Sequence, residues 1–314
     1  MYYRGHIPDH PEVVKKRLGL HLHPDYARMR ATALPLQTTN RAKLPVSAGG
    51  PGVQNQGDAS DCEGFAHSSG ATLRLAIAGT PLPEVISGVG LYYGALLADR
   101  SPNPDGTLPP IFDNGTGPSS IISGWGRWGA AGRSAWGQVP SGSATMYQNP
   151  SDPNSALINP TPEQLYSEFP CKFAGAFFIQ TSGLQKVIDI YSALAAGYPV
   201  SDAIPASGGV FQSYSGGILT AEQMTGPFDH ANLLVDVEWT GSLGQFNAWL
   251  GGEAGLDAYL VGHGVNSWGG VGCVDGGSWG EVDPLNGLGG QYRFDRSFFD
   301  MLQSPCVLAV TRSS

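Results

Sequence analysis

Charged side chains are scarce in this chain, in which 14% of the 314 residues are Asp, Glu, Lys or Arg, whereas about a quarter is usual in soluble domains. The 26 acidic residues outnumber the 17 basic ones, for a formal net charge of -9, and no stripe of Lys and Arg occurs. This balance argues against a nucleic-acid partner. No run of about 18 apolar residues occurs either, so we expect no transmembrane helix and no membrane partner.

Signals for secretion and for metal binding are also missing. The first six residues contain no apolar core of a signal peptide, so we expect a cytoplasmic location or a place within a larger assembly. The four cysteines form no C-x-x-C pair and stand at Cys62, Cys171, Cys273 and Cys306. This spacing indicates no structural zinc site, and we expect neither a metal nor another cofactor. Reduced thiols are the default expectation for a chain without a signal peptide.

Glycine and proline are abundant, at 45 and 24 residues. Together with a hydrophobic content of 41%, they predict a sizeable core whose elements are joined by many loops and turns. Apolar residues recur at helical spacing over 62–78, 84–99 and 119–129. Capping-box patterns at Thr161 and Ser182 predict two further helices.

Strand-like segments joined by glycine-rich loops dominate the rest of the chain. They are predicted at 198–204, 209–214, 230–239, 257–266 and 290–295. Helices first and strands second are typical of an α+β fold with two lobes. We therefore divide the chain into an N-terminal extension (1–43), a mostly helical lobe (44–180) and a β-rich lobe (181–314). Two interpretations of the extension are possible, a docking arm or a short inhibitory segment.

A glutamine and a cysteine six residues apart, Gln56 and Cys62, combine two parts of a thiol hydrolase in one short segment. A helix that begins at Cys62 directs its N-terminal N–H groups at the sulfur and favours the thiolate. The backbone N–H of Cys62 and the side-chain amide of Gln56 are suitable donors for the oxygen of an anionic tetrahedral intermediate. A lone cysteine is usually an inert core residue, so the interpretation depends on its partners.

Those partners are predicted in the β-rich lobe. His230, which follows Asp229, can act as a general base toward the thiol. Asn266, which opens an Asn-Ser-Trp-Gly segment, can orient the imidazole. Taken alone, His230 is more often a core histidine. The occurrence of Cys, His and Asn together, in that order, indicates a thiol hydrolase.

These segments resemble the papain-like cysteine peptidases, the papain and cathepsin group. The similar stretches lie in the family's order and comprise residues 53–57 with Cys62, 114–115, 197–201 with 211–218, 229–231 and 266–269. They cover most of residues 44–299. The resemblance implies a helical left lobe, an antiparallel β-barrel-like right lobe and a cleft between them that takes a polypeptide substrate.

The resemblance also implies roles for individual residues. Cys62 would be the nucleophile and His230 its general base. Asn266 would orient His230, and Gln56 would donate to the oxyanion. The substrate-binding positions that it implies are Asn114, Gly115, Asp229 and Trp268, of which Trp268 would also shield the hydrogen bond between His230 and Asn266.

Three departures from the family pattern affect the surroundings of the nucleophile. Ala59 replaces the cysteine that forms the usual left-lobe disulfide. Asp61 and Glu63 flank Cys62, and each would raise the pKa of the thiol by about one pH unit if it lay about 6 to 7 Å away at intermediate dielectric. Insertions are expected at 240–255 and 269–290, both beside the cleft.

Three functions stay open at this point. The first is an active endopeptidase or a related amide hydrolase, which the complete set of residues favours. The second is a papain-like fold that serves as a structural or binding component of a large assembly such as a virion, since a fold does not determine a function. The third is an unrelated thiol enzyme, such as a cell-wall peptidase or a transglutaminase-like protein, which would not require Gln56 or the segment 266–269.

Overall fold

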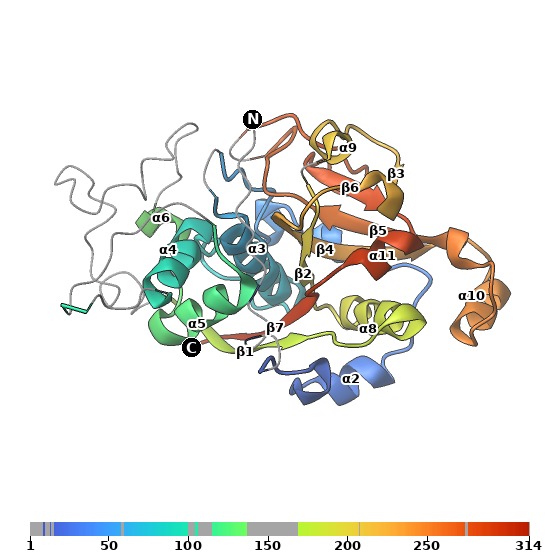
Figure 1. Ribbon diagram of the computed structural model, residues 1–314, viewed down its shortest axis with the longest axis horizontal. Helices are drawn as coiled ribbons and strands as arrows, with labels where there is room; N and C mark the ends of the chain where they lie inside the picture. Colours follow the sequence, from blue (N-terminus) through green and yellow to red (C-terminus); the bar gives the residue numbers. More distant parts are fainter. Residues whose placement is uncertain are drawn as a thin grey trace.

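The computed structural model describes residues 9, 13, 16–57, 60–99, 104–105, 115–136, 169–206, 208–273 and 276–313. No helix within these ranges is long and apolar enough to cross a membrane. The architecture is α+β, with helices in the N-terminal part and an antiparallel sheet in the C-terminal part (Figure 1), as predicted.

Three helices form the left half of the view in Figure 1: α3 (Cys62–Ile77), α4 (Gly88–Ala98) and α5 (Pro118–Trp128). They approach one another closely because glycines face neighbouring backbones. A Cβ atom at Gly64 would overlap the carbonyl of Gly88 at the start of α4, and one at Gly124 would overlap the backbone at Gly94. The glycines of this half thus set the distance between its helices.

The first of these helices has its predicted boundaries, whereas the second begins later than predicted. The helix that begins at Cys62 ends where Gly79 takes a φ of +74°, a common way to terminate a helix. The next helix was expected from residue 84 but begins at Gly88, because Ser87 is the N-cap and accepts a hydrogen bond from the Gly90 N–H.

One seven-stranded sheet makes up the other half, with the strand order β1-β7-β2-β4-β5-β6-β3. The strands are β1 (Cys171–Phe178), β2 (Val200–Ile204), β3 (Ile218–Leu219), β4 (His230–Trp239), β5 (Leu260–Val265), β6 (Gln291–Phe294) and β7 (Cys306–Arg312). Neighbouring strands run antiparallel, apart from β3 and β6. The register pairs Ile204 with His230 and Leu233 with Val265, so the start of β4 lies beside one end of β2 and of β5.

Helices pack on both faces of the sheet. Leu233 and Val235 of β4 lie in one cluster with Leu73 of α3. Leu234, between them in sequence, lies in the largest core cluster with side chains of α8 (Gly183–Ala195). Because successive residues of a strand point to opposite faces, α3 and α8 cover opposite faces of β4. Burial of these apolar surfaces is the main source of stability for the arrangement.

The other elements are short. They are η1 (Leu20–Leu22), α2 (Tyr26–Ala31), η2 (Asn40–Lys43), η3 (Val46–Ala48), α6 (Arg133–Trp136), α9 (Gly209–Gln212), η5 (Ala221–Gln223), α10 (Leu243–Leu250), η6 (Asp257–Tyr259) and α11 (Arg296–Met301).

Several local predictions fail for identifiable reasons. The segment 209–214 was predicted as a strand but forms α9, where Ser213 Oγ donates back to the Gly209 carbonyl at 2.6 Å and Phe211 is fully buried. Ser182 is the N-cap of α8 without a side-chain cap bond, since Gln185 instead donates to Asp189 at 2.8 Å. The helix predicted at Thr161 lies outside the described residues.

The insertion at 240–255 was predicted beside the cleft but lies at the end of β4 that is far from His230. It folds into α10, which begins with a capping box between Ser242 and Gln245. Phe246 and Trp249 of this helix pack against Trp239, the last residue of β4. His230 is the first residue of the same ten-residue strand, so the length of β4, about 30 Å, separates α10 from His230. Figure 1 shows α10 at the right edge of the view.

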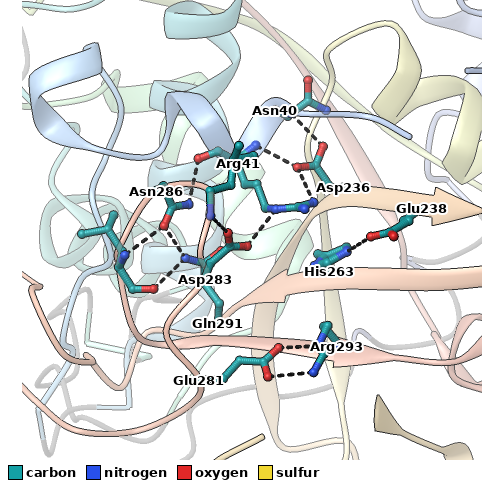
Figure 2. A network of polar contacts seen from close by, with 12 residues as sticks. Asn40, Arg41, Asp236, Glu238, His263, Glu281, Asp283, Asn286, Gln291 and Arg293 are labelled. Carbon is teal, nitrogen blue, oxygen red and sulfur yellow. Dashed lines mark hydrogen bonds and ion pairs between the residues drawn. The ribbon is translucent and has the colours of Figure 1, made fainter. Parts of the chain in front are cut away.

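A buried arginine attaches the N-terminal segment to the sheet, as Figure 2 shows. Arg41 Nη1 lies 3.1 Å from Asp236 of β4, and its Nε lies 2.8 Å from Asp283 in the loop after Trp268. Asp236 also accepts hydrogen bonds from the Asn40 N–H at 2.7 Å and the Thr38 hydroxyl at 2.6 Å. One cation thus neutralises two buried carboxylates that come from distant parts of the chain.

Replacing this arginine should destabilise the whole domain. Arg41→Met leaves Asp236 and Asp283 buried without their cation, and removal of one member of a buried ion pair costs about 3 to 5 kcal/mol. We expect a loss of that order in the free energy of unfolding, measured by urea denaturation at pH 7.

Arg293→Met is the matched control. Arg293 pairs with Glu281 at 2.7 Å, but its side chain is 41% exposed, and exposed pairs contribute at most about 1 kcal/mol. Equal losses for the two variants would contradict the assigned role of Arg41.

Candidate active site

Cys62 is the first residue of α3, as the sequence predicts, and Asp61 occupies the N-cap position. The first N–H groups of a helix have no partners within it and carry partial positive charge, so the sulfur sits where a thiolate is favoured. The Cys62 Sγ accepts a hydrogen bond from the backbone N–H of Ala231 at 3.3 Å. This contact brings the sulfur to the residue that follows His230.

His230 and Asn266 are joined by a short hydrogen bond. The His230 Nε2 lies 2.6 Å from Asn266 Oδ1, and the same oxygen accepts the Ser267 N–H at 2.7 Å. Because Oδ1 can only accept, the Nε2 atom carries the proton. In the neutral ring Nδ1 is then the basic nitrogen. The strand pairing of β4 with β5 places these two residues side by side.

Aromatic rings enclose this hydrogen bond. The ring centroid of Trp268 lies 4.6 Å from that of His230, and the ring centroid of Phe211 lies 6.3 Å from that of His230 and 5.5 Å from that of Trp268. Trp268 is fully buried and continues into a cluster with Trp279 and Tyr292. A low-polarity enclosure strengthens the hydrogen bond by excluding water.

Gln56 lies on a segment that pairs with the residues after Asn266. Its backbone N–H donates to the Ser267 carbonyl at 2.7 Å, and Asn55 forms an isolated antiparallel bridge with Trp268. The Ser267 hydroxyl donates to Gln56 Oε1, which orients the amide. The segment before α3 is therefore tied directly to the segment that carries Asn266.

The other predicted substrate-binding positions differ in their surroundings. Gly115 has a φ of +85°, and its N–H donates to the Tyr92 hydroxyl at 2.9 Å, so this N–H is already engaged within the protein. Asp229 Oδ1 accepts the Ala206 N–H at 2.9 Å and supports the turn after β2. Asn114 lies outside the described residues.

Known structures of cysteine proteases resemble this chain over nearly its whole length. Xylellain, a cysteine protease from Xylella fastidiosa, aligns with a TM-score of 0.63 at 15% identity, over 99% of this chain and 97% of that one. The digestive procathepsin L2 proteinase of the Tenebrio molitor larval midgut aligns with a TM-score of 0.61 at 17% identity, over 98% and 78%. The chain has the papain-like fold.

A third neighbour is the SERA5 proenzyme of Plasmodium falciparum, with a TM-score of 0.59 at 13% identity over 99% of this chain and 72% of that one. No protein-family model matches the chain, and no curated protein matches it in sequence. The likeness to papain-like cysteine proteases is therefore one of three-dimensional structure.

The four side chains at the centre of this papain-like site are deeply buried. Cys62, His230 and Gln56 are 0% exposed and Asn266 is 1% exposed. Burial strengthens every electrostatic interaction among these groups.

Glu63, the acidic residue after Cys62, has a partner that the sequence does not directly reveal. Glu63 Oε2 lies 3.3 Å from Nδ1 of His67, one helical turn later. The i, i+4 spacing of an acid and a histidine on a predicted helix is the signal that would have found it. Among the residues with assigned positions, no group of three His, Cys, Asp or Glu side chains has the geometry of a metal site.

The remaining cysteines should differ from one another in reactivity. No disulfide joins any of the four, all of which lie in described segments. Burial raises the pKa of the Cys171 thiol to about 12, so this thiol stays protonated at pH 8, whereas Cys273 is half-buried. We expect N-ethylmaleimide at pH 8 to label Cys273 and to leave Cys171 unlabelled until urea is added.

Peptide mass spectrometry of the labelled protein measures both sites in one sample. Labelling of Cys171 in the native protein as fast as Cys273 would show that β1 is more accessible than its packing indicates.

Proposed function

We propose that the protein is a papain-like cysteine peptidase that hydrolyses peptide bonds with Cys62 as nucleophile and His230 as general base. The 2.6 Å hydrogen bond between His230 and Asn266, next to a sulfur at the N-terminus of α3, is the observation that carries this proposal. It supports an imidazole held in one tautomer, with Nδ1 as its basic nitrogen.

The first half of the reaction forms an acyl-enzyme. Cys62 gives its proton to His230 and attacks the carbonyl carbon of the peptide bond, so a C–S bond forms and the carbonyl oxygen becomes an oxyanion. When this intermediate collapses, the C–N bond breaks and the imidazolium returns its proton to the leaving amine. Asn266 holds the ring in place during both transfers.

The second half releases the acid. A water molecule gives a proton to His230 and attacks the thioester carbon, and the C–S bond then breaks to restore the cysteine. In both halves the oxyanion is proposed to accept hydrogen bonds from the Cys62 N–H and the Gln56 side-chain amide. The Ser267 hydroxyl supports this, because it donates to Gln56 Oε1 and thereby orients the amide.

The substrate is proposed to be a polypeptide, as the fold implies. Gly115 offers an extended substrate its carbonyl, since its N–H donates to Tyr92. Asn114 is proposed to act from the same loop, and Asp229 to act by supporting the turn beside His230. Trp268 is proposed to shield the pair of His230 and Asn266 from water.

The alternative of a binding component in a large assembly has less support. A surface that only binds has no need for a buried imidazole held by an amide and covered by a tryptophan. Buried polar groups of this kind are costly unless they are fully hydrogen-bonded, and catalytic sites are where such groups recur. We therefore favour the hydrolase.

We propose that residues 17–43 form an integral part of the β-rich half. The Thr38 N–H donates to the Val237 carbonyl at 2.9 Å, and the Trp239 N–H donates to the Leu36 carbonyl at 2.6 Å. These backbone bonds, together with the Arg41 ion pairs, support attachment along β4 and argue against a segment that is shed on activation.

Hydrolysis of a fluorogenic peptide library at pH 5 to 7 tests the proposal. We expect Cys62→Ala and His230→Ala to lower kcat/KM by about 10⁴-fold or more, since triad members act as a unit. Asn266→Ala should have a smaller effect through loss of ring orientation. Mass spectrometry should find the acyl-enzyme on Cys62 after a rapid quench.

Cys273→Ala is the control, because this half-buried thiol has no role in the proposed reaction and should leave kcat/KM unchanged. Absence of turnover in the native protein, together with a stable complex of unaltered mass, would favour a binding component instead.

A further inference from the structure

Directly behind the nucleophile, α3 buries a second set of ionisable side chains that the proposed mechanism does not use. Glu63 is 2% exposed, His67 is 1% exposed, and Cys306 of β7 is 1% exposed. Glu63 follows Cys62 in sequence, and His67 lies one turn further along the helix. The set combines an acid, an imidazole and a thiol in the interface between α3 and the sheet.

The geometry around His67 defines the state of its ring. The Nδ1 atom lies 2.9 Å from the Glu63 carbonyl oxygen and 3.3 Å from Glu63 Oε2. Both oxygens accept hydrogen bonds, so Nδ1 carries a proton. Cys306 of β7 is buried in the same interface, where β7 packs against α3.

A carboxylate at position 63 raises an electrostatic problem for the adjacent thiol. A buried charge is stable only when it is paired, and a negative group near a thiol opposes its ionisation. Cys62 turns toward Ala231 of β4, whereas Glu63 turns toward His67, so the two side chains share one turn of helix and point to different neighbours.

We propose that His67 is a positioning residue whose positive charge cancels that of Glu63, so that Cys62 ionises beside a neutral first turn of α3. The inference rests on the proposed function of Cys62 as nucleophile. In this proposal the positive charge of His67 offsets the negative charge of Glu63, so that the neighbouring Cys62 can ionise to a thiolate.

Other groups around α3 are compatible with this assignment. The ionisable groups that act on His67 are Glu63 of its own helix and Cys306 of β7. Of the elements packed against α3, β4 brings the apolar Ala231 and Leu233 together with His230, the proposed general base. The element η2 brings Arg41, whose charge is paired with Asp236 and Asp283, and β2 brings the buried Asp202. Asp61 precedes the helix at the N-cap, where a negative charge is favoured by the helix dipole.

The charge on His67 persists across the working range of a thiol enzyme. Burial alone would lower the pKa of His67, but hydrogen bonds and charge interactions with Cys306 and Glu63 outweigh it and raise the pKa to about 10. Because the folded value exceeds the ordinary 6.5, the stabilisation by this charge is complete below pH 6.5. It is lost as the pH rises to about 10.

The test is the pH profile of Cys62 alkylation by iodoacetamide, measured by peptide mass spectrometry in native protein. His67→Gln keeps a hydrogen-bond donor but removes the charge. We expect the midpoint of the profile to rise by about one to two pH units and the rate at pH 6 to fall about tenfold or more. The double variant Glu63→Gln/His67→Gln removes both charges and should return the midpoint to the wild-type value.

Two further measurements separate charge from structure. Cys306→Ala removes the buried thiol of β7 but leaves the pair of Glu63 and His67 intact, and should move the midpoint less than His67→Gln does. In ¹⁵N-histidine-labelled wild-type protein, the His67 signal, assigned by its loss in the variant, should remain that of an imidazolium at pH 8.

A neutral His67 at pH 8, or the same midpoint in wild type, His67→Gln and the double variant, would overturn the inference. These outcomes are independent of turnover. If the midpoint shifts and returns as expected but no Cys62-dependent hydrolysis is found, only the proposed function is contradicted. If the protein is an active peptidase but the midpoint does not move, only the role of His67 is contradicted.

Discussion

The N-terminal end of α3 packs against the first residues of β4, and most of the site depends on this contact. The hydrogen bond from the Ala231 N–H to Cys62 Sγ joins the helical half of the chain to the sheet. The same end of β4 carries His230, whose ring is held by Asn266 after the neighbouring strand β5. A shift of α3 by one residue along the sheet would remove the sulfur from the imidazole.

Buried ion pairs occur at several places in the molecule. With 14% charged residues, the chain still places several in its interior, and some of these are paired with an opposite charge. Arg41 lies between Asp236 and Asp283, and His67 lies against Glu63. Such pairs are weak sources of net stability but strongly penalise any arrangement that separates them. They therefore specify how the N-terminal segment, α3 and the sheet fit together.

The sequence predicts those parts of the fold that local patterns determine. The helix from Cys62 follows from apolar side chains at helical spacing and the glycine that ends it, and β4 follows from its apolar run after His230. The strand β1 was missed because its alternation is interrupted by a bulge between Phe173 and Gly175. The segment 209–214 has the composition of a strand, but burial of Phe211 against Trp268 and Trp279 holds it as a helical turn.

In the candidate site, too, residues in local motifs could be predicted and contacts between distant segments could not. Cys62, His230, Asn266 and Gln56 could be named in advance because each stands in a short motif. The contacts of Arg41 could not, since they depend on how distant segments meet at the sheet, whereas the pair of Glu63 and His67 is local and has a recognisable i, i+4 spacing. Arg41 meets an aspartate 195 residues later in the chain. Such partners become visible only when the register of the strands is known.

The most direct test of the central claim is a crystal structure of the protein after reaction with a peptide aldehyde. The account predicts a thiohemiacetal on Cys62 Sγ, with the His230 ring in hydrogen-bonding distance and the new oxygen between the Cys62 N–H and the Gln56 amide. An adduct on another residue, or an oxygen that points away from both donors, would contradict it.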